Sequence, residues 1–270
     1  MSAGAPRVLP QGAVWAPTAH PGACGVAGRA SGGTLAGPSC MRVTSILCSM
    51  LLLLHLAASA RADEVKRGAS TFRPLGKPQR GRATFYDAKD VGACGLEPGA
   101  DERLLAAVSR PQYERSATCG ACAEVEGPQG TVRVRIVDLC SSCKAGDLDL
   151  SREAFAKVAP LHAGRIAVHW RLVSCEVEGP LRYRFKEGST QWWAALQVRN
   201  HRVPIEKMEW WKEGVWVELK RQPYNYFVTP SAMGKGPVRL RVTSTDGQAR
   251  EDTLPAIRSG ETLIGSAQFD

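Results

Sequence analysis

Several stretches of the chain alternate apolar and polar residues with a period of two, which indicates β-strands. In residues 131–139, TVRVRIVDL, the apolar residues Val132, Val134 and Ile136 alternate with arginines. Residues 164–175, GRIAVHWRLVSC, repeat this pattern. Because successive side chains of a strand point to opposite faces, each stretch can turn one face to a core and the other to solvent. The residues between about 81 and 178 are therefore predicted to form a mostly-β unit.

Residues 151–159, SREAFAKVA, are the one convincing helix in this half of the chain. Ser151 is suited to be the N-cap, because its hydroxyl can accept a hydrogen bond from a free amide of the first turn. Phe155, Val158 and Ala159 form the expected buried stripe. Pro160 cannot continue the helix and is predicted to end it.

The last third of the chain contains short strand patterns at even spacing and no cysteine. The patterns are AALQVRN, IEKMEWW, VWVELKR and VRLRVTST, separated by turn signals at Lys212-Glu213-Gly214 and Asp246-Gly247. Several short alternating strands joined by turns predict a β-sandwich of about ninety residues. The boundary with the first unit is expected near residues 177–181, so the second domain covers 179–270.

The first 62 residues do not fit either domain. Residues 1–40 are rich in Gly, Ala, Pro and Ser, contain no acidic residue and show no periodicity, so we expect them to be untranslated or disordered. Residues 41–62 have Arg42, an apolar run and a final Ala-x-Ala, which is typical of a secretory signal peptide starting at Met41 and cleaved after Ala62 or Ala60. A membrane anchor is the alternative, although the apolar run is short for a span. Residues 63–80 are charged and contain proline, which predicts a flexible segment.

Charge and cysteine content agree with a secreted protein. The expected leader carries four basic residues and no acidic one, so its removal lowers the formal charge from +9 to +5. Residues 180–270 hold 14 basic and 10 acidic side chains, and such an excess attracts polyanions. Export favours an acidic polysaccharide, pectin or peptidoglycan for example, over nucleic acid.

Six cysteines remain after the leader, which is an even number within one short segment and indicates disulfides in an oxidising compartment. Their positions are Cys94, Cys119, Cys122, Cys140, Cys143 and Cys175. The pairs CGAC and CSSC have a spacing that could also hold zinc, and CxxC occurs in redox proteins, but the leader and the two further cysteines favour disulfides. Six cysteines allow fifteen pairings.

The stretch CSSCKAGDLDLS, residues 140–151, carries the candidate chemistry. If it is extended, Asp147 and Asp149 project from one face, with about 6.5 Å between their α-carbons. That spacing resembles the carboxylate pair of an inverting glycosidase, but such a pair must flank the scissile bond from opposite sides. Alternatively, Asp147 is a solvated turn residue and Asp149 accepts hydrogen bonds from helix amides. A third carboxylate, Asp138, lies near the end of the strand predicted at 131–139. None of these carboxylates by itself is specific evidence of a particular function.

The order ATFYD, GACG, CGACAEV, GPQGTVRVRIVDLC, GDLDLS and HWRLVSC, followed by KEGSTQWWAALQVRNHRVPIEKMEW and PYNYFVTP, resembles the bacterial expansins over residues 81–270. The resemblance implies an all-β fold, in which a six-stranded double-psi β-barrel (81–178) is followed by an immunoglobulin-like carbohydrate-binding sandwich (179–270). The two would form a continuous polysaccharide groove.

The resemblance also assigns roles to residues. Asp149, Asp138, Thr84 and Tyr86 would line the polysaccharide groove, and Trp192, Trp193 and Tyr224 would stack on sugar rings. Adjacent tryptophans can share one face only if the backbone after KEGST is irregular, whereas Trp170, Trp210, Trp211 and Trp216 are expected in core or hairpin positions. The implied disulfides are Cys94–Cys119, Cys122–Cys175 and Cys140–Cys143. Cys140 stands where close bacterial relatives have a tyrosine.

The implied function is binding of cellulose and plant cell-wall polysaccharide and their loosening without hydrolysis, by a secreted monomer. Related endoglucanases keep a general acid and a general base. Here Asp149 matches the acid, while Thr84 and Phe85 stand where the base would be and Asp87 is the nearest carboxylate. Without a base, turnover should be lost. No cofactor, metal or nucleic acid is expected. The alternatives are a weak endo-β-glucanase that uses Asp87, a peptidoglycan lytic enzyme, and an inert binding module.

Overall fold

The computed structural model describes residues 72–89, 91–99 and 101–270. The predictions for residues 1–40, for the signal peptide at 41–62 and for most of the segment 63–80 therefore lie outside the described residues.

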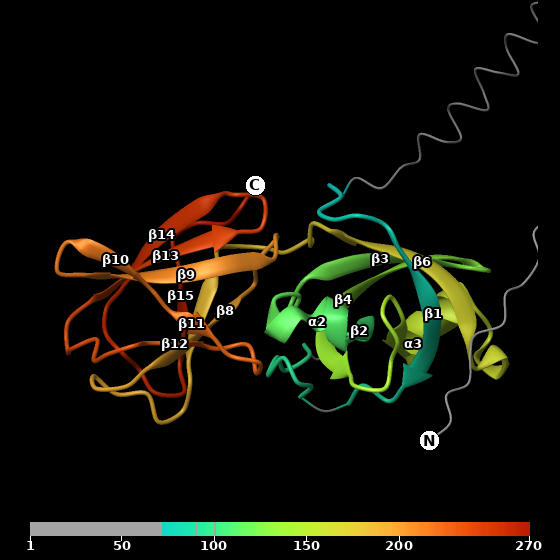
Figure 1. Ribbon diagram of the computed structural model, residues 1–270, viewed down its shortest axis with the longest axis horizontal. Coiled ribbons are helices and arrows are strands. Elements are labelled where there is room, and N and C mark those ends of the chain that lie inside the picture. The colour runs from blue at the N-terminus through green and yellow to red at the C-terminus, as the bar shows by residue number, and fades with distance from the viewer. Residues whose placement is uncertain (1–71, 90, 100) are drawn as a thin grey trace, which may run out of the picture. The chain divides into compact units, whose positions relative to one another are not determined.

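Six strands form a closed barrel in the order β1-β5-β2-β4-β3-β6 (Figure 1). Their bounds are β1 Gln79–Tyr86, β2 Leu105–Ser109, β3 Cys122–Gly127, β4 Gly130–Cys140, β5 Leu148–Ser151 and β6 Ile166–Val173. The pairs β1–β5 and β2–β4 are parallel, and the other four pairs are antiparallel. A barrel has no open sheet edge, so every strand finds a partner on both sides. The predicted barrel fold is confirmed.

Alternation along the strands fills the barrel interior. Val132, Val134 and Ile136 of β4 are buried, while the arginines between them are partly exposed, as the sequence predicts. The helix α3, Arg152–Val158, buries Phe155 completely against the barrel, and the hydroxyl of Ser151 accepts a hydrogen bond from the amide of Ala154 as the predicted N-cap. Two short elements, α2 (Arg110–Tyr113) and the 3₁₀ turn Glu114–Ser116, follow β2, and a second 3₁₀ turn, Leu161–Ala163, precedes β6.

The remaining strands form two sheets, which pack face to face around a second core. One sheet has the order β10-β9-β13-β14 and the other the order β11-β12-β8-β7-β15. The bounds are β7 Arg182–Phe185, β8 Ala195–Arg199, β9 Ile205–Lys212, β10 Val215–Glu218, β11 Lys220–Arg221, β12 Phe227–Val228, β13 Val238–Ser244, β14 Ala249–Leu254 and β15 Thr262–Ile264. Antiparallel sheets with one buried face each agree with the predicted sandwich.

Hydrogen bonds to one barrel loop link the barrel to the sandwich. The side-chain amides of Gln197 and Asn225 both donate to the carbonyl of Cys94, at 2.9 and 3.1 Å. The hydroxyl of Tyr113 donates toward the carbonyls of Ala93 and Pro223, at 3.1 and 2.7 Å. The barrel loop around Cys94 thus lies against the sandwich loop that precedes β12.

One part of the segment expected to be flexible is ordered by specific contacts. Pro74 pairs with Val173 beside β6, and the guanidinium of Arg73 reaches Asp246 of the sandwich at 2.6 Å. These contacts join the described residues 72–78 to partners that lie far away in the sequence.

All six cysteines of the barrel form disulfides: Cys94–Cys119, Cys122–Cys175 and Cys140–Cys143. This is the pairing that the resemblance implies. The first bond anchors the loop that meets the sandwich, and the third closes the turn between β4 and β5.

Candidate functional site

Strand register brings four distant residues into one row across the barrel wall. Thr84 of β1 is paired with Asp149 of β5, Asp149 with Ala107 of β2, and Ala107 with Asp138 of β4. Asp149 and Asp138 are thus separated by one intervening strand, which corresponds to about 9.6 Å between backbones. The two carboxylates assigned by resemblance therefore lie in the same row.

The carboxylate of Asp149 is half-buried and has one side-chain partner. The hydroxyl of Thr84 donates a hydrogen bond to its Oδ1 at 2.7 Å. Burial raises the pKa of Asp149 above its usual value, the Thr84 hydrogen bond opposes this shift, and the negative charge of Asp138 adds to it. A carboxyl with a raised pKa holds its proton to higher pH, as a general acid must.

Asp138 is held by one backbone amide of the loop that meets the sandwich and by one of its own strand, β4. Its Oδ1 accepts hydrogen bonds from the amides of Ala93 and Leu139, at 2.7 and 2.8 Å. Burial raises the pKa of the Tyr86 hydroxyl well above the usual value. The negative charges of the nearby Asp138 and Asp149 raise this pKa further. The phenol is therefore a neutral hydrogen-bond donor at neutral pH.

Two other candidate carboxylates have different surroundings. Asp147 lies on the same side of the chain as Asp149, but its Oδ1 accepts the backbone amide of Arg82 at 2.8 Å. Asp87 pairs with Arg152 at 3.3 Å and lines a separate cavity with Arg103 and Glu153. The alternative that Asp149 caps the helix is wrong, because Ser151 occupies that role and Asp149 faces Thr84.

A pocket of about 130 Å³ contains Thr84 and Asp149, and we call it the aspartate pocket. Its lining is Arg82, Thr84, Cys140, Ser142, Cys143, Lys144, Asp147, Leu148, Asp149 and Arg165. The disulfide Cys140–Cys143 forms part of its wall. Sequence reasoning missed the three basic residues here, because they come from three separate segments and no local motif joins them.

The three aromatic residues assigned to sugar stacking are exposed on the sandwich. Trp192 is 73% exposed, Trp193 40% and Tyr224 43%. The amides of both tryptophans point toward the hydroxyl of Thr190, at 3.2 and 3.3 Å, and the amide of Thr190 donates to the carbonyl of Trp193. This tight turn is the irregular backbone that lets two adjacent indoles reach the surface.

The other tryptophans have structural positions, as expected. Trp170 is buried in the barrel core, and its Nε1 donates to the carbonyl of Gly146 at 2.8 Å. Trp210 is buried in the sandwich core. Trp211 and Trp216 face each other across the β9–β10 hairpin with ring centroids 5.0 Å apart.

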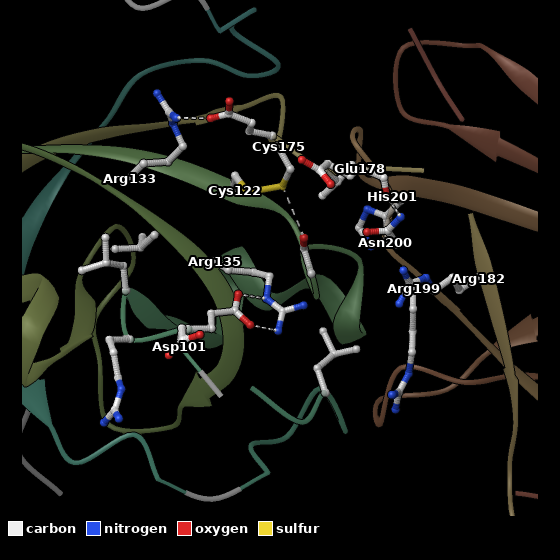
Figure 2. Close-up of a pocket in the computed structure, with 18 of the residues that line it drawn as sticks. Asp101, Cys122, Arg133, Arg135, Cys175, Glu178, Arg182, Arg199, Asn200 and His201 are labelled. Carbon is white, nitrogen blue, oxygen red and sulfur yellow. Dashed lines mark hydrogen bonds and ion pairs between the residues drawn. A yellow bond between two sulfur atoms is a disulfide. The ribbon is translucent and has the colours of Figure 1, made fainter. Parts of the chain in front are cut away.

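Another cavity, with a volume of about 730 Å³, lies elsewhere. Figure 2 shows Arg133 and Arg135 entering it from the barrel, and Arg182, Arg199 and His201 from the sandwich. Arg135 is held by Glu102 at 2.5 Å, and burial lowers the pKa of His201 to about 4, which leaves the imidazole neutral. Among the described residues that line this cavity there is no Trp, Tyr or Phe that could stack on a sugar ring. We therefore assign the candidate site to the aspartate pocket and the exposed aromatic residues.

Two further searches covered only the part of the chain that the structure describes. Within these residues no cluster of His, Cys, Asp and Glu is arranged to hold a metal ion. Within the same residues no helix is long and apolar enough to cross a membrane.

A closed six-stranded barrel with a polar pocket, followed by a sandwich with exposed aromatic residues, defines a double-psi β-barrel protein with an appended sandwich. A family model described as "Lytic transglycolase" matches residues 105–170, within the barrel. Expansin-YoaJ of Bacillus subtilis is 34% identical over 241 residues, which are 84% of this chain and 98% of that protein. The apo structure of a Clavibacter michiganensis expansin is 36% identical, covers 71% of this chain and 98% of its own, and has a TM-score of 0.67.

A second solved structure, of an aspartate-to-asparagine variant of the Clavibacter michiganensis expansin in complex with cellohexaose, matches with 35% identity, the same coverage and a TM-score of 0.67. The match to Expansin-YoaJ extends over nearly the whole length of that protein. The chain belongs to the expansin family.

Proposed function

We propose that the protein binds cellulose and related cell-wall polysaccharides and loosens them without hydrolysis. One observation carries the proposal: Asp149 has the environment of a general acid, whereas the other candidate carboxylates, Asp87 and Asp138, are already engaged by other groups. Asp87 is engaged by Arg152 in another cavity, and one oxygen of Asp138 is held by two backbone amides. An acid without a base can bind and protonate a sugar oxygen but cannot activate water.

The exposed aromatic residues supply the apolar part of binding. Trp192 and Trp193 present large flat surfaces that bury much area with little loss of side-chain entropy. Tyr224 follows Pro223, whose carbonyl is bonded to Tyr113, and the Cys94 loop beside it also carries the amide that holds Asp138. This connection supports a single binding surface from the aspartates to the sandwich. Cellohexaose in the complex of a related expansin is consistent with a β-glucan ligand.

Loosening follows from differential binding. Polar groups at Asp149, Asp138, Thr84 and Tyr86 hydrogen-bond the hydroxyls of one glucan chain, while the aromatic residues hold its ring faces. If the bound conformation differs from that of a chain packed on its neighbours, binding shifts the population away from the packed state. The wall then yields under load while its covalent bonds stay intact.

The site of action is outside the cell. The expected signal peptide occupies residues 41–62, and three disulfides in a barrel of this size suit an oxidising compartment. The net positive charge favours acidic wall polymers, pectin or peptidoglycan, as additional partners.

The test is a paired measurement on wild type and Asp149→Asn. A clamped cellulosic wall strip is held under constant load, its extension is recorded, and reducing ends are counted in the same bath. Extension without new reducing ends, lost in Asp149→Asn but kept in a matched Asp87→Asn control, supports non-hydrolytic loosening. Reducing ends in proportion to extension would refute it.

A weak glycan-cleaving activity is the second candidate, and two observations favour it. The barrel matches a family model described as a lytic enzyme, and the pKa of Asp149 is raised, chiefly by burial. Asp138 is the other carboxylate of the same row. Release of reducing ends from soluble β-glucan, or of muropeptides from peptidoglycan, that Asp138→Asn or Asp87→Asn abolishes would favour this activity.

A further inference from the structure

Three basic side chains converge on the aspartate pocket from separate parts of the barrel. Arg82 belongs to β1, Lys144 to the turn between β4 and β5, and Arg165 to the loop before β6. All three are exposed. The pocket contains two carboxylates, so its lining has a net charge of +1 by formal count. The local surplus is therefore one positive charge.

The three cations of the aspartate pocket have no ion-pair partner in the described part of the chain. Among the residues described, no ion pair includes Arg82, Lys144 or Arg165. Arg135, in the larger cavity of Figure 2, is by contrast held by Glu102. The side chains at the aspartate pocket are therefore available to an external anion.

The two carboxylates of the pocket are already hydrogen bonded. One oxygen of Asp147 accepts the backbone amide of Arg82, and one oxygen of Asp149 accepts the hydroxyl of Thr84. A ligand that brings a carboxylate would find cationic donors that have no ion-pair partner. A monoanion matches a net charge of +1 better than a dianion does, because the second charge of a dianion would face the two aspartates uncompensated.

Arg82 lies at one end of the polar row, along β1. Side chains at alternate positions share a face, so Arg82, Thr84 and Tyr86 follow one another along one side of the strand. Tyr86 is near Asp138, whose loop meets the sandwich. Arg82 lies in the opposite direction from Thr84, by about 6.6 Å along the strand.

The turn that carries Lys144 is held in place rather than loose. The Cys140–Cys143 disulfide closes it, the amide of Asp147 donates to the carbonyl of Lys144 at 2.9 Å, and Trp170 donates to the carbonyl of Gly146. Gly146 has φ of 84°, and a β-carbon there would lie 2.4 Å from the carbonyl oxygen of Arg80. A turn fixed at these points presents Lys144 with a smaller ordering cost on binding.

We propose that the aspartate pocket is a terminal subsite for a uronic acid, so that the protein selects polysaccharides that carry carboxylated sugars at this end of the bound chain. The inference rests on the proposed function, because the subsite continues the polar row to which we assign sugar binding. Arg82, Lys144 and Arg165 bind the sugar carboxylate, and Thr84 and Asp149 bind hydroxyls of the adjacent residue.

The test compares two probes that differ only in their carboxylates: cellohexaose and a β-1,4-linked hexamer of glucuronic acid. Calorimetric titration at low ionic strength gives the affinity of the protein for each probe, and the measured quantity is their ratio. Three exposed charge contacts together should favour the glucuronate hexamer about tenfold. The ratio should decrease toward one as salt screens these contacts.

Variants separate this pocket from the general positive charge of the protein. The triple variant Arg82→Gln, Lys144→Gln, Arg165→Gln should lower the ratio to about one. A control with the same loss of charge, Lys157→Gln, Arg182→Gln, Lys220→Gln, removes exposed cations that do not line the aspartate pocket and should keep most of the preference. An equal loss of preference in both variants, or none in the first, overturns the inference. Salt titration of the wild type gives an independent measure should the first variant fold poorly.

Failure of the inference and failure of the proposed function give different results. Equal affinity of the wild type for both hexamers overturns the uronate subsite and leaves β-glucan binding in place. Binding of the glucuronate hexamer alone, lost in the first triple variant, supports the subsite and refutes the assignment of cellulose as a ligand.

Discussion

Replacing Ser151 by alanine should destabilise the barrel strongly, although the serine lies outside the aspartate pocket. Its side chain makes three hydrogen bonds in a nearly solvent-free position, 1% exposed. The hydroxyl donates to the carbonyl of Arg103 at 2.6 Å and accepts from the amides of Leu105 and Ala154 at 3.1 and 3.2 Å. It therefore ties the start of α3 to the segment that leads into β2.

The magnitude follows from these contacts. Loss of an N-cap serine costs about 1 kcal/mol, and each further buried group left without a partner costs about 1–3 kcal/mol. Partial relaxation of the helix start offsets some of this, so we expect a loss of about 2–4 kcal/mol in the free energy of unfolding. Against a typical total of about 5–15 kcal/mol, this is a large fraction.

Equilibrium urea unfolding with disulfides intact measures the change, and amide hydrogen exchange at Leu105 and Ala154 reports on the barrel itself. Ser142→Ala, a serine-to-alanine change at an exposed position of the nearby turn, is the matched control and should alter stability by less than about 0.5 kcal/mol. A Ser151→Ala effect as small as that of the control would refute the reasoning that these three bonds stabilise the barrel.

Three more outcomes are expected. Burial raises the pKa of Asp149, so its charged form destabilises the fold at a pH above that pKa. At pH 7 the variant Asp149→Asn should therefore unfold at a urea concentration equal to or higher than that of the wild type. A lower urea midpoint would contradict this. Trp192→Ala should weaken binding to cellulose about tenfold in a pull-down isotherm, whereas Val215→Ala, at an exposed position 58% accessible on the hairpin, should not. Burial raises the pKa of Asp246, but its hydrogen bonds, including that from Arg73, outweigh this and lower the pKa well below the usual value. Its contribution to stability is therefore full at pH 7 and declines as the pH falls below the usual pKa of about 4. Asp246→Asn should destabilise the protein at pH 7 in thermal unfolding, and its difference from wild type should shrink steadily from about pH 4 downward.

Much of the architecture could be predicted from local pattern. The strand at 131–139 and the helix that Ser151 caps agree with the structure because alternation and capping depend on neighbours in sequence. The strands β12 and β15 have only two and three residues, too few to show such a pattern, and are defined by the partners that they meet.

The candidate site divides in the same way. From the sequence, both Trp192 and Trp193 could be exposed only if the backbone before them were irregular. The turn at Thr190 is the irregular backbone that this requires. The sequence shows that Asp87 is the carboxylate nearest to the position of the missing base, but it does not show which groups surround Asp87 in the fold. Its pairing with Arg152 depends on where α3 packs against the barrel.

By itself, the sequence determined which residues alternate, where a helix can begin, and that six cysteines suit an exported barrel. Only the tertiary structure decided which strands are neighbours. Thr84 and Asp149 are 65 positions apart, and the parallel pairing of β1 with β5 sets them side by side, just as three separate segments bring Arg82, Lys144 and Arg165 to one pocket. The physical reason is that a period of two specifies which face a side chain takes, whereas the neighbour across the ladder is selected by closure of the barrel and packing of its core.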